Sequence, residues 1–192
     1  MIYPALEELY TQSRKPKELW ISNLVFCPRM EYLSYFFVPR VRTVSESALA
    51  GILIHRIIQE DLKKKGYEIE KRVEYDLGDG WKLVGKIDAV NSDHVIEIKT
   101  TKDLNKGIQP HWLSQANLYA YLAGLDKYVI LVINKLTGEY VENEYSTDKN
   151  KAEEDLIRAE MLKECIINKK IPEGRKDWCK KYCEFAVLCD AL

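Results

Sequence analysis

The sequence lacks the features of membrane proteins, secreted proteins and polycationic nucleic-acid coats. No apolar run in its 192 residues approaches the roughly 18 residues that a membrane-spanning helix needs. The N-terminus has neither the basic start nor the apolar stretch of a signal peptide. Basic and acidic residues nearly cancel, at 29 against 30, so any contact with nucleic acid must come from a local patch. We therefore expect a cytoplasmic protein without membrane association.

Internal repeats and low-complexity tracts are also absent from the sequence. The composition, 46% hydrophobic and 31% charged, is that of a globular protein, and the length indicates one domain over 1–192. We divide it into an N-terminal helical segment at 1–44, a core at 45–170 and a cysteine-rich tail at 171–192. The tail is too short to fold unaided. Basic residues at 169–181 make this stretch the best candidate for a phosphate-facing patch.

Apolar periodicity and turn formers predict alternating helices and strands. We expect a helix over 22–37 that Pro28 interrupts, and a second helix that opens at a capping box, 43–46, and ends near Gly66. The remaining predicted elements are strands near 67–75, 81–90 and 94–101, a helix over 110–124, strands near 127–134 and 140–145, and a helix over 148–169. This order predicts an α/β (α+β) fold with a mixed central sheet flanked by helices.

The strongest chemical signal lies in two neighbouring strands. Asp88 ends one apolar run, and Glu97-Ile98-Lys99 lies in the next, with turn formers at 91–93 between them. In a hairpin the two carboxylates can converge on one cation, and Glu97 and Lys99 point to the same face. Hard divalent cations prefer carboxylate oxygens, and a lysine can neutralise a phosphate or activate a water. The pattern predicts a metal-dependent phosphodiesterase; the alternative is an ordinary hairpin with charges on its wet face.

These residues resemble the RecB-like branch of the PD-(D/E)XK nucleases. In that branch a helix with a histidine precedes an aspartate strand, an E-x-K strand and a helix with Q-x-x-x-Y. The matching residues occur here in the same order: His55, Asp88, Glu97 with Lys99, and Gln115 with Tyr119. The resemblance implies a restriction-endonuclease-like core and DNA as the substrate.

The resemblance also implies a Mg²⁺ or Mn²⁺ site. Asp88 and Glu97 would hold the ion, with the Ile98 carbonyl as a third oxygen and His55 as a nitrogen ligand. An imidazole ligand favours Mn²⁺ relative to an all-oxygen site. For His55 the alternative is a helix histidine that is hydrogen-bonded in the core.

Three further residues receive catalytic roles from the same resemblance. Lys99 would orient the attacking water or stabilise charge on the phosphate. Gln115 and Tyr119 lie one helical turn apart, on one face of a helix. They would hydrogen-bond a phosphate or the catalytic lysine; the alternative is a polar pair on the helix surface.

The five cysteines divide into one that stands alone, one in a helix and three near the C-terminus. Cys27 stands alone, Cys165 lies on an apolar helix face as a core thiol, and Cys179, Cys183 and Cys189 are spaced C-x3-C-x5-C. Disulfides are rare in cytoplasmic proteins. Zinc sites usually come as two close pairs, so one cysteine plus three fits an iron–sulfur cluster better. Structural zinc and four free buried thiols are the alternatives.

Branches of the RecB-like nucleases carry this one-plus-three pattern: AddB-type subunits and the CRISPR-associated exonucleases, the fourth core family of those systems. There the cluster ties the C-terminal tail to the N-terminal helix. The usual family spacing is C-x2-C-x5-C, and this chain has one more residue between the first two cysteines. A 4Fe–4S cluster is favoured, with 2Fe–2S as the alternative.

Length separates the two branches, because AddB-type proteins are far longer. The resemblance thus implies a stand-alone CRISPR-associated DNA exonuclease, which acts on single-stranded or free-ended DNA during spacer acquisition, or a close viral or archaeal relative of it. The spacer-integration proteins would be its partners. The alternatives are a structure- or site-specific endonuclease on the same core, or a non-catalytic subunit of an integration complex. Cleavage polarity and oligomeric state, including a homo-oligomer, stay open.

Overall fold

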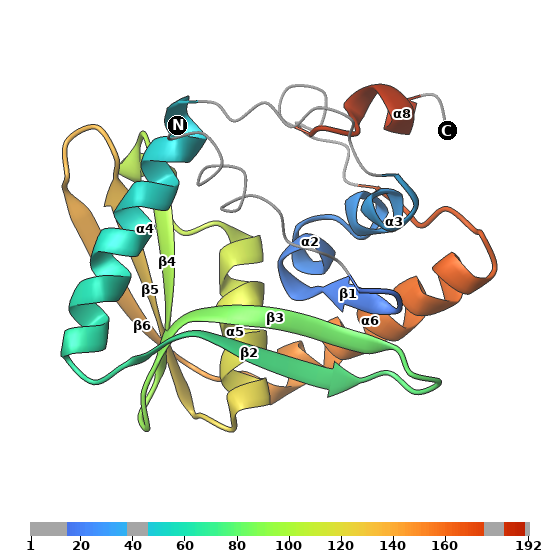
Figure 1. Cartoon of the computed structure of the whole chain (residues 1–192), viewed down its shortest axis with the longest axis horizontal. Helices are drawn as coiled ribbons and strands as arrows, with labels where there is room; N and C mark the ends of the chain where they lie inside the picture. The colour runs from blue at the N-terminus through green and yellow to red at the C-terminus, as the bar shows by residue number, and fades with distance from the viewer. Residues whose placement is uncertain (1–14, 38–45, 175–182, 191–192) are drawn as a thin grey trace, which may run out of the picture.

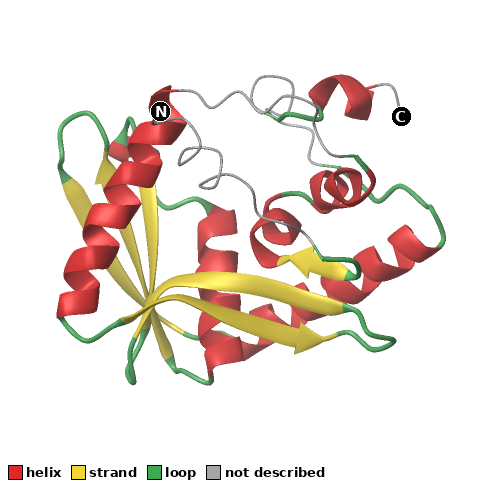
Figure 2. Cartoon of the chain, in the orientation of Figure 1, coloured by secondary structure: helices red, strands yellow, loops and turns green. Residues whose placement is uncertain are grey.

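The computed structural model describes residues 15–37, 46–174 and 183–190. In these residues, strands from both halves of the chain form one mixed sheet with helices on both faces (Figures 1 and 2). The strands are β1 (Glu18–Trp20), β2 (Glu68–Asp76), β3 (Lys82–Val90), β4 (Val95–Thr101), β5 (Lys127–Asn134) and β6 (Tyr140–Ser146). Their order is β1-β3-β4-β5-β6, and β2 pairs with β3.

Parallel and antiparallel pairs alternate across this sheet. β1 runs parallel to β3, and β4 runs parallel to β5, whereas β2–β3, β3–β4 and β5–β6 are antiparallel. The prediction of a mixed central sheet flanked by helices is therefore confirmed.

Helices cover the two faces unequally. They are α2 (Ile21–Phe26), α3 (Pro28–Phe36), α4 (Glu46–Lys64), α5 (Pro110–Ala123), α6 (Lys149–Ile167) and α8 (Ala186–Asp190), with a short 3₁₀ turn, η1 (Leu104–Lys106). On one face α4 packs Ile54 and Ile58 against Ile96 and Ile98. On the other face α2, α5 and α6 bury the larger core (Figure 1). None of the helices in the described ranges is long and apolar enough to cross a membrane.

Most predicted elements occur within a few residues of their expected bounds. The break at Pro28 is confirmed, because Cys27 is extended and Pro28 begins α3. Helix α6 ends at Ile167, earlier than expected, and Lys169 then takes a left-handed backbone with φ 53°. Strand β1 was not predicted, since three residues give no periodicity. Residues 43–45 of the predicted capping box lie outside the described residues.

A fork between β3 and β4 creates the setting for the chemistry. The two strands pair only at Ala89 with Ile96 and at Val90 with Val95, next to their turn. Beyond these pairs β3 stays with β2 and β1, whereas β4 stays with β5. Backbone groups in the fork lack their usual partners in the sheet, so side chains can take their place.

Candidate active site

Asp88 fills the fork where the β3–β4 pairing ends. Its Oδ2 accepts a hydrogen bond from the backbone N–H of Ile98 at 2.8 Å, and its Oδ1 lies 3.6 Å from His55 Nδ1. The carboxylate thus replaces a missing backbone acceptor and joins β3, β4 and α4. The structure places three of the predicted site residues together here.

Glu97 is almost fully buried, and only one of its two carboxylate oxygens has a partner. Its Oε1 lies 2.7 Å from Lys99 Nζ, whereas its buried Oε2 has no hydrogen-bond partner. Burial raises the pKa of Glu97 to about 7; the charge of Asp88 adds to this effect and that of Lys99 opposes it. A buried carboxylate oxygen without a partner is costly, so this position favours a bound cation.

Lys99 begins a chain of polar contacts that leads into α5. Its Nζ donates to Gln115 Oε1 at 2.9 Å, and Gln115 Nε2 donates to the Tyr119 hydroxyl at 3.2 Å. Burial raises the pKa of Tyr119, and the negative charge of Glu97 raises it further, so the phenol stays protonated. Gln115 therefore contacts the lysine directly, which is one of the two roles that the resemblance implied, and Tyr119 is linked to the lysine through Gln115.

Gly85 makes room for this chain of contacts, a role that sequence reasoning missed. A Cβ at this position would lie 2.4 Å from Tyr119 Cε1, far inside any normal contact. The tyrosine ring therefore crosses directly over the β3 backbone. A glycine three residues before Asp88, inside a strand, was the available signal for such a close approach.

Helix α4 lies unusually close to the sheet, and this closeness brings His55 to the fork. A Cβ at Gly51 would meet Thr100 Oγ1 at 2.9 Å, so glycine permits the approach. Two turns further along, Gln59 Nε2 donates to the Asp88 backbone carbonyl at 3.2 Å. The helix is thus anchored to both β4 and β3 on either side of His55.

The side-chain atoms in the fork are of the types that bind divalent metal ions. Asp88 and Glu97 offer carboxylate oxygens, one of them unpartnered, and His55 offers a ring nitrogen. In the described ranges, however, no three His, Cys, Asp or Glu side chains are already gathered around one point. Glu97 instead forms an ion pair with Lys99, and the carboxylates of Asp88 and Glu97 influence each other electrostatically.

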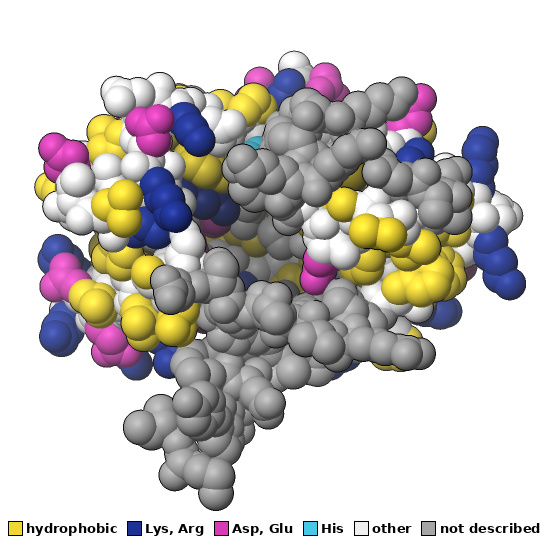
Figure 3. Space-filling view, turned by 90° about the horizontal axis from the view of Figure 1, so that it is seen from above, with side chains coloured by type: hydrophobic (Ala, Val, Ile, Leu, Met, Phe, Trp, Pro, Cys, Tyr) yellow, Lys and Arg dark blue, Asp and Glu magenta, His cyan; other side chains and the backbone are white. Residues whose placement is uncertain are grey.

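A hollow lies above this region of the molecule. Seen from above, it separates the side that carries α4 from the side that carries α2 and α3, and Lys and Arg side chains lie on the α4 side (Figure 3). Although the net charge is near zero, the α4 side of the hollow therefore offers local positive charge.

Three of the four candidate cluster cysteines lie in one neighbourhood. Cys27 is buried between α2 and α3, and burial raises the pKa of Cys183, with Cys27 and Cys189 adding to the effect. Arg29 Nη1 lies 3.5 Å from Cys189 Sγ, and its Nε donates to the Pro172 carbonyl at 2.8 Å. The tail therefore contacts α3.

The structure describes one of the other two cysteines. Cys179 lies outside the described residues. Cys165 packs against the main core from α6, as expected for a core thiol.

The comparisons with known proteins agree with this arrangement. The chain matches the profile of the PD-(D/E)XK nuclease superfamily over residues 6–190. It belongs to that superfamily. Members of this superfamily are nucleases, a class of hydrolases, and they typically use divalent metals. No curated protein matches the chain.

Solved structures resemble the chain over most of its length. The crystal structure of SSO0001 has a TM-score of 0.78 and 26% identity, covering 99% of this chain and 94% of its own. An alkaline exonuclease, LHK-Exo, from Laribacter hongkongensis has a TM-score of 0.63 and 10% identity, covering 85% and 94%. A candidate exonuclease from Eubacterium rectale has a TM-score of 0.60 and 14% identity, and the match covers 95% of this chain and 91% of that protein. At their identities the two exonucleases show a shared fold alone.

Proposed function

We propose that this PD-(D/E)XK nuclease is a metal-dependent DNA exonuclease that acts on single-stranded or free-ended DNA. One observation carries the proposal: the fork brings Asp88, Glu97 and Lys99 together and leaves a buried Glu97 oxygen without a partner. The resemblance in fold to alkaline exonucleases supports it, and LHK-Exo has also been crystallised with dAMP.

The residues of the fork suit a Mg²⁺ or Mn²⁺ ion. Asp88 and Glu97 would hold it, with His55 and the Ile98 carbonyl as further ligands. When bound, the ion would supply Lewis-acid polarisation of the phosphate and would acidify a water. Glu97 can accept such an ion because one of its oxygens is uncommitted, whereas Asp88 is already oriented by the Ile98 N–H.

Lys99 is positioned to act on the phosphate. Glu97 and Gln115 hold two sides of its ammonium group, at 2.7 and 2.9 Å, and the side chain is about one-fifth exposed. A third N–H can then stabilise charge that develops on the scissile phosphate or orient the attacking water. Gln115 is itself held by Tyr119, so the lysine is oriented before the substrate arrives.

A digestion assay separates the competing activities. Linear end-labelled single strands and covalently closed circles are incubated with the full chain and Mn²⁺, with Asp88→Asn as the inactive control. The proposal predicts progressive shortening of linear strands and intact circles. Circles cut as fast as linear strands would establish an endonuclease, whereas no digestion of either would favour the non-catalytic subunit.

The cysteines support a second component of the proposal, an iron–sulfur cluster held by Cys27, Cys179, Cys183 and Cys189. Its support is the shared neighbourhood of Cys27, Cys183 and Cys189, which come from opposite ends of the chain. Protein purified without oxygen should be brown and contain iron and sulfide. A colourless protein with one zinc ion per chain would replace the cluster by a structural zinc site.

A role in CRISPR spacer acquisition follows from the one-plus-three cysteines, the order of the nuclease motifs and the chain length. The proposed partners are the spacer-integration proteins. Spacer length and number in cells that carry the wild-type chain should differ from those with Asp88→Asn. Identical spacer populations would remove this role and leave the nuclease assignment untouched.

A further inference from the structure

Strand β2 departs from regular strand geometry directly across from Asp88. The ladder between β2 and β3 pairs Ile69 with Ala89, omits the next two facing residues, Glu70 and Asp88, and then resumes. Glu70 has φ 55°, a left-handed backbone that is uncommon for a residue other than glycine, asparagine or aspartate. Such a backbone costs free energy and persists only where surrounding contacts hold it, so its position opposite Asp88 calls for a functional reason.

Two contacts hold the Glu70 carboxylate at this kink. Its Oε1 accepts from Gln59 Nε2 at 3.0 Å, and its Oε2 accepts from Lys86 Nζ at 2.8 Å. Gln59 belongs to α4 and Lys86 to β3, so the carboxylate joins β2 to both elements. A kink that only protected an edge strand from pairing with another chain would need neither contact.

Gln59 carries the effect of Glu70 to Asp88. The side chain is only 8% exposed, and its Nε2 also donates to the Asp88 backbone carbonyl at 3.2 Å. Both partners are pure acceptors, so together they determine which way the amide group faces. Without Glu70 a buried N–H of Gln59 would lose its partner, which favours rotation of the amide or movement of α4 away from β3.

The Gln59 amide controls the spacing of two proposed metal ligands. Asp88 is held at both ends, since Gln59 binds its carbonyl and the Ile98 N–H binds its Oδ2. His55 lies one helical turn before Gln59 on α4, with its Nδ1 3.6 Å from Asp88 Oδ1. Any movement of α4 relative to β3 would therefore change the separation of His55 and Asp88.

We propose that Glu70 is a positioning residue for the metal site of the fork, and that it fixes the distance between His55 and Asp88 through Gln59. Glu70 is no ligand itself, because Gln59 and Lys86 engage its two oxygens. The inference rests on the proposed nuclease function and adds to its site a residue from β2. It predicts that loss of this carboxylate weakens metal binding in a protein that stays folded.

The test compares Glu70→Gly and Glu70→Gln with wild type. Glycine removes the carboxylate but suits the left-handed backbone, so it separates the positioning role from a role in folding. Glutamine keeps an oxygen that can accept from Gln59 and loses the charge. Glu74→Ala is the matched control, because Glu74 lies on the same strand and forms an ion pair with Lys82 of β3.

Affinity for Mn²⁺ is measured by electron paramagnetic resonance of the free ion, and folding by thermal unfolding in EDTA. Glu70→Gly should bind Mn²⁺ about tenfold more weakly, as expected when a residue that orients a metal ligand is lost. Its unfolding temperature should stay within about 4 °C of wild type. Glu70→Gln should bind more tightly than Glu70→Gly, and Glu74→Ala should bind like wild type. Wild-type affinity in a folded Glu70→Gly protein would overturn the inference.

A double variant tests whether Glu70 acts through Gln59. Gln59→Met keeps the length of the side chain and removes both N–H groups, so it should weaken Mn²⁺ binding as much as Glu70→Gly does. Combining the two changes should weaken binding no further, because they break one chain of contacts. Fully additive losses would overturn the route through Gln59. If Glu70→Gly does not fold, wild-type affinity in Gln59→Met would overturn the inference by itself.

Hydrogen exchange in EDTA gives a readout that needs no metal ion. Peptides of α4 should exchange faster in Glu70→Gly than in wild type, whereas peptides of β5 should exchange alike in both proteins. If wild type binds no Mn²⁺, the proposed function fails and this inference fails with it. If wild type binds Mn²⁺ and Glu70→Gly matches it in affinity and exchange, only the positioning role fails.

Discussion

The fork and the cysteine region are built in opposite ways. The fork takes Asp88, Glu97 and Lys99 from two adjacent strands, and backbone and side-chain hydrogen bonds hold them in a buried sheet. The cysteine region brings Cys27 together with Cys183 and Cys189 from the other end of the chain, and α8 has only five residues. The fold itself orders the fork. In the described part of the tail, Phe185 joins the main core and Cys183, Leu188 and Cys189 pack against it, and the proposed cluster would add to these contacts.

This difference predicts how each region responds to the loss of its ligand. Removing a divalent ion from the fork should leave the protein folded, because the site residues already contact one another. Removing a cluster from the cysteines should release the tail, because metal ligation then supplies much of its docking free energy.

Asp88→Asn should abolish DNA cleavage while the protein stays folded. The amide keeps an oxygen for the Ile98 N–H but removes the charge that a metal ion needs. Single-turnover digestion with Mn²⁺ measures the loss, and thermal unfolding measures folding. A folded variant that cleaves like wild type would remove Asp88 from the chemistry.

Lys99→Ala should reduce the cleavage rate by a factor of roughly 10², as for a lost stabiliser of transition-state charge. Tyr119→Phe, which keeps the buried ring but loses the hydroxyl contact with Gln115, should have a smaller effect in the same direction. Equal rates for Lys99→Ala and wild type would show that the lysine only neutralises Glu97.

Cys27→Ala should remove the cluster and expose the tail to protease, with the sheet intact. The comparison variant is Cys165→Ala, which should keep both the colour and the protease resistance. Limited proteolysis with mass spectrometry locates the cuts. A Cys27→Ala tail as resistant as that of wild type would mean that packing alone holds it.

Gly85→Ala should destabilise the protein by about 1–3 kcal/mol, because a methyl group would overlap the Tyr119 ring. The double variant Gly85→Ala with Tyr119→Ala should lose less than the sum of the single losses, since the smaller side chain makes room. Chemical denaturation measures all four proteins. Strict additivity would mean that the two residues do not press on each other.

Arg29→Gln should have the smallest effect, a modest rise in protease sensitivity of the tail. The change removes the contacts with the Pro172 carbonyl and with Cys189. It should leave digestion of short DNA unchanged, because Arg29 belongs to the cysteine region. A loss of the tail as complete as in Cys27→Ala would make Arg29, and not the thiols, its main attachment.

Local patterns predicted the hairpin that carries the fork. Turn formers at 91–93 separate two apolar runs, and the structure has β3 and β4 on either side of them. The spacing of Gln115 and Tyr119 predicted that both lie on one face of a helix. In the structure Gln115 hydrogen-bonds to both Lys99 and Tyr119.

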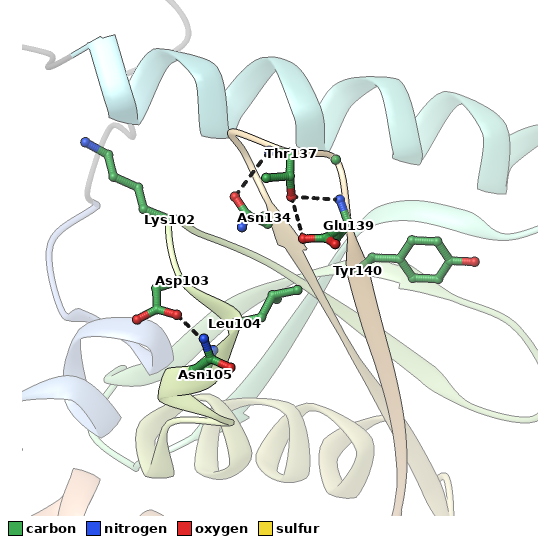
Figure 4. Close-up of a pocket in the computed structure, with 9 residues that line it drawn as sticks. Lys102, Asp103, Leu104, Asn105, Asn134, Thr137, Glu139 and Tyr140 are labelled. Carbon is green, nitrogen blue, oxygen red and sulfur yellow. Dashed lines mark hydrogen bonds between the residues drawn. The ribbon is translucent and has the colours of Figure 1, made fainter.

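Contacts between distant parts of the chain could not be predicted from local sequence patterns. Strand β1 exists because it pairs with β3, and nothing within its three residues signals that partner. Gly85 was visible as a glycine in a strand, yet its neighbour Tyr119 lies in a helix far along the chain. A polar pocket lined by Asn134 lies between the loop after β4 and the β5–β6 turn (Figure 4), and it depends on how these two loops meet, which residue spacing does not encode.

The most direct test of the account is a Mn²⁺ titration of the fork, followed by electron paramagnetic resonance of the free ion. Wild type should bind the ion, Glu97→Gln should lose that binding, and Lys99→Gln should keep it, because the lysine competes for Glu97 and is no ligand itself. Ion binding by Glu97→Gln equal to that of wild type, or none by wild type, would contradict a metal-dependent site in the fork.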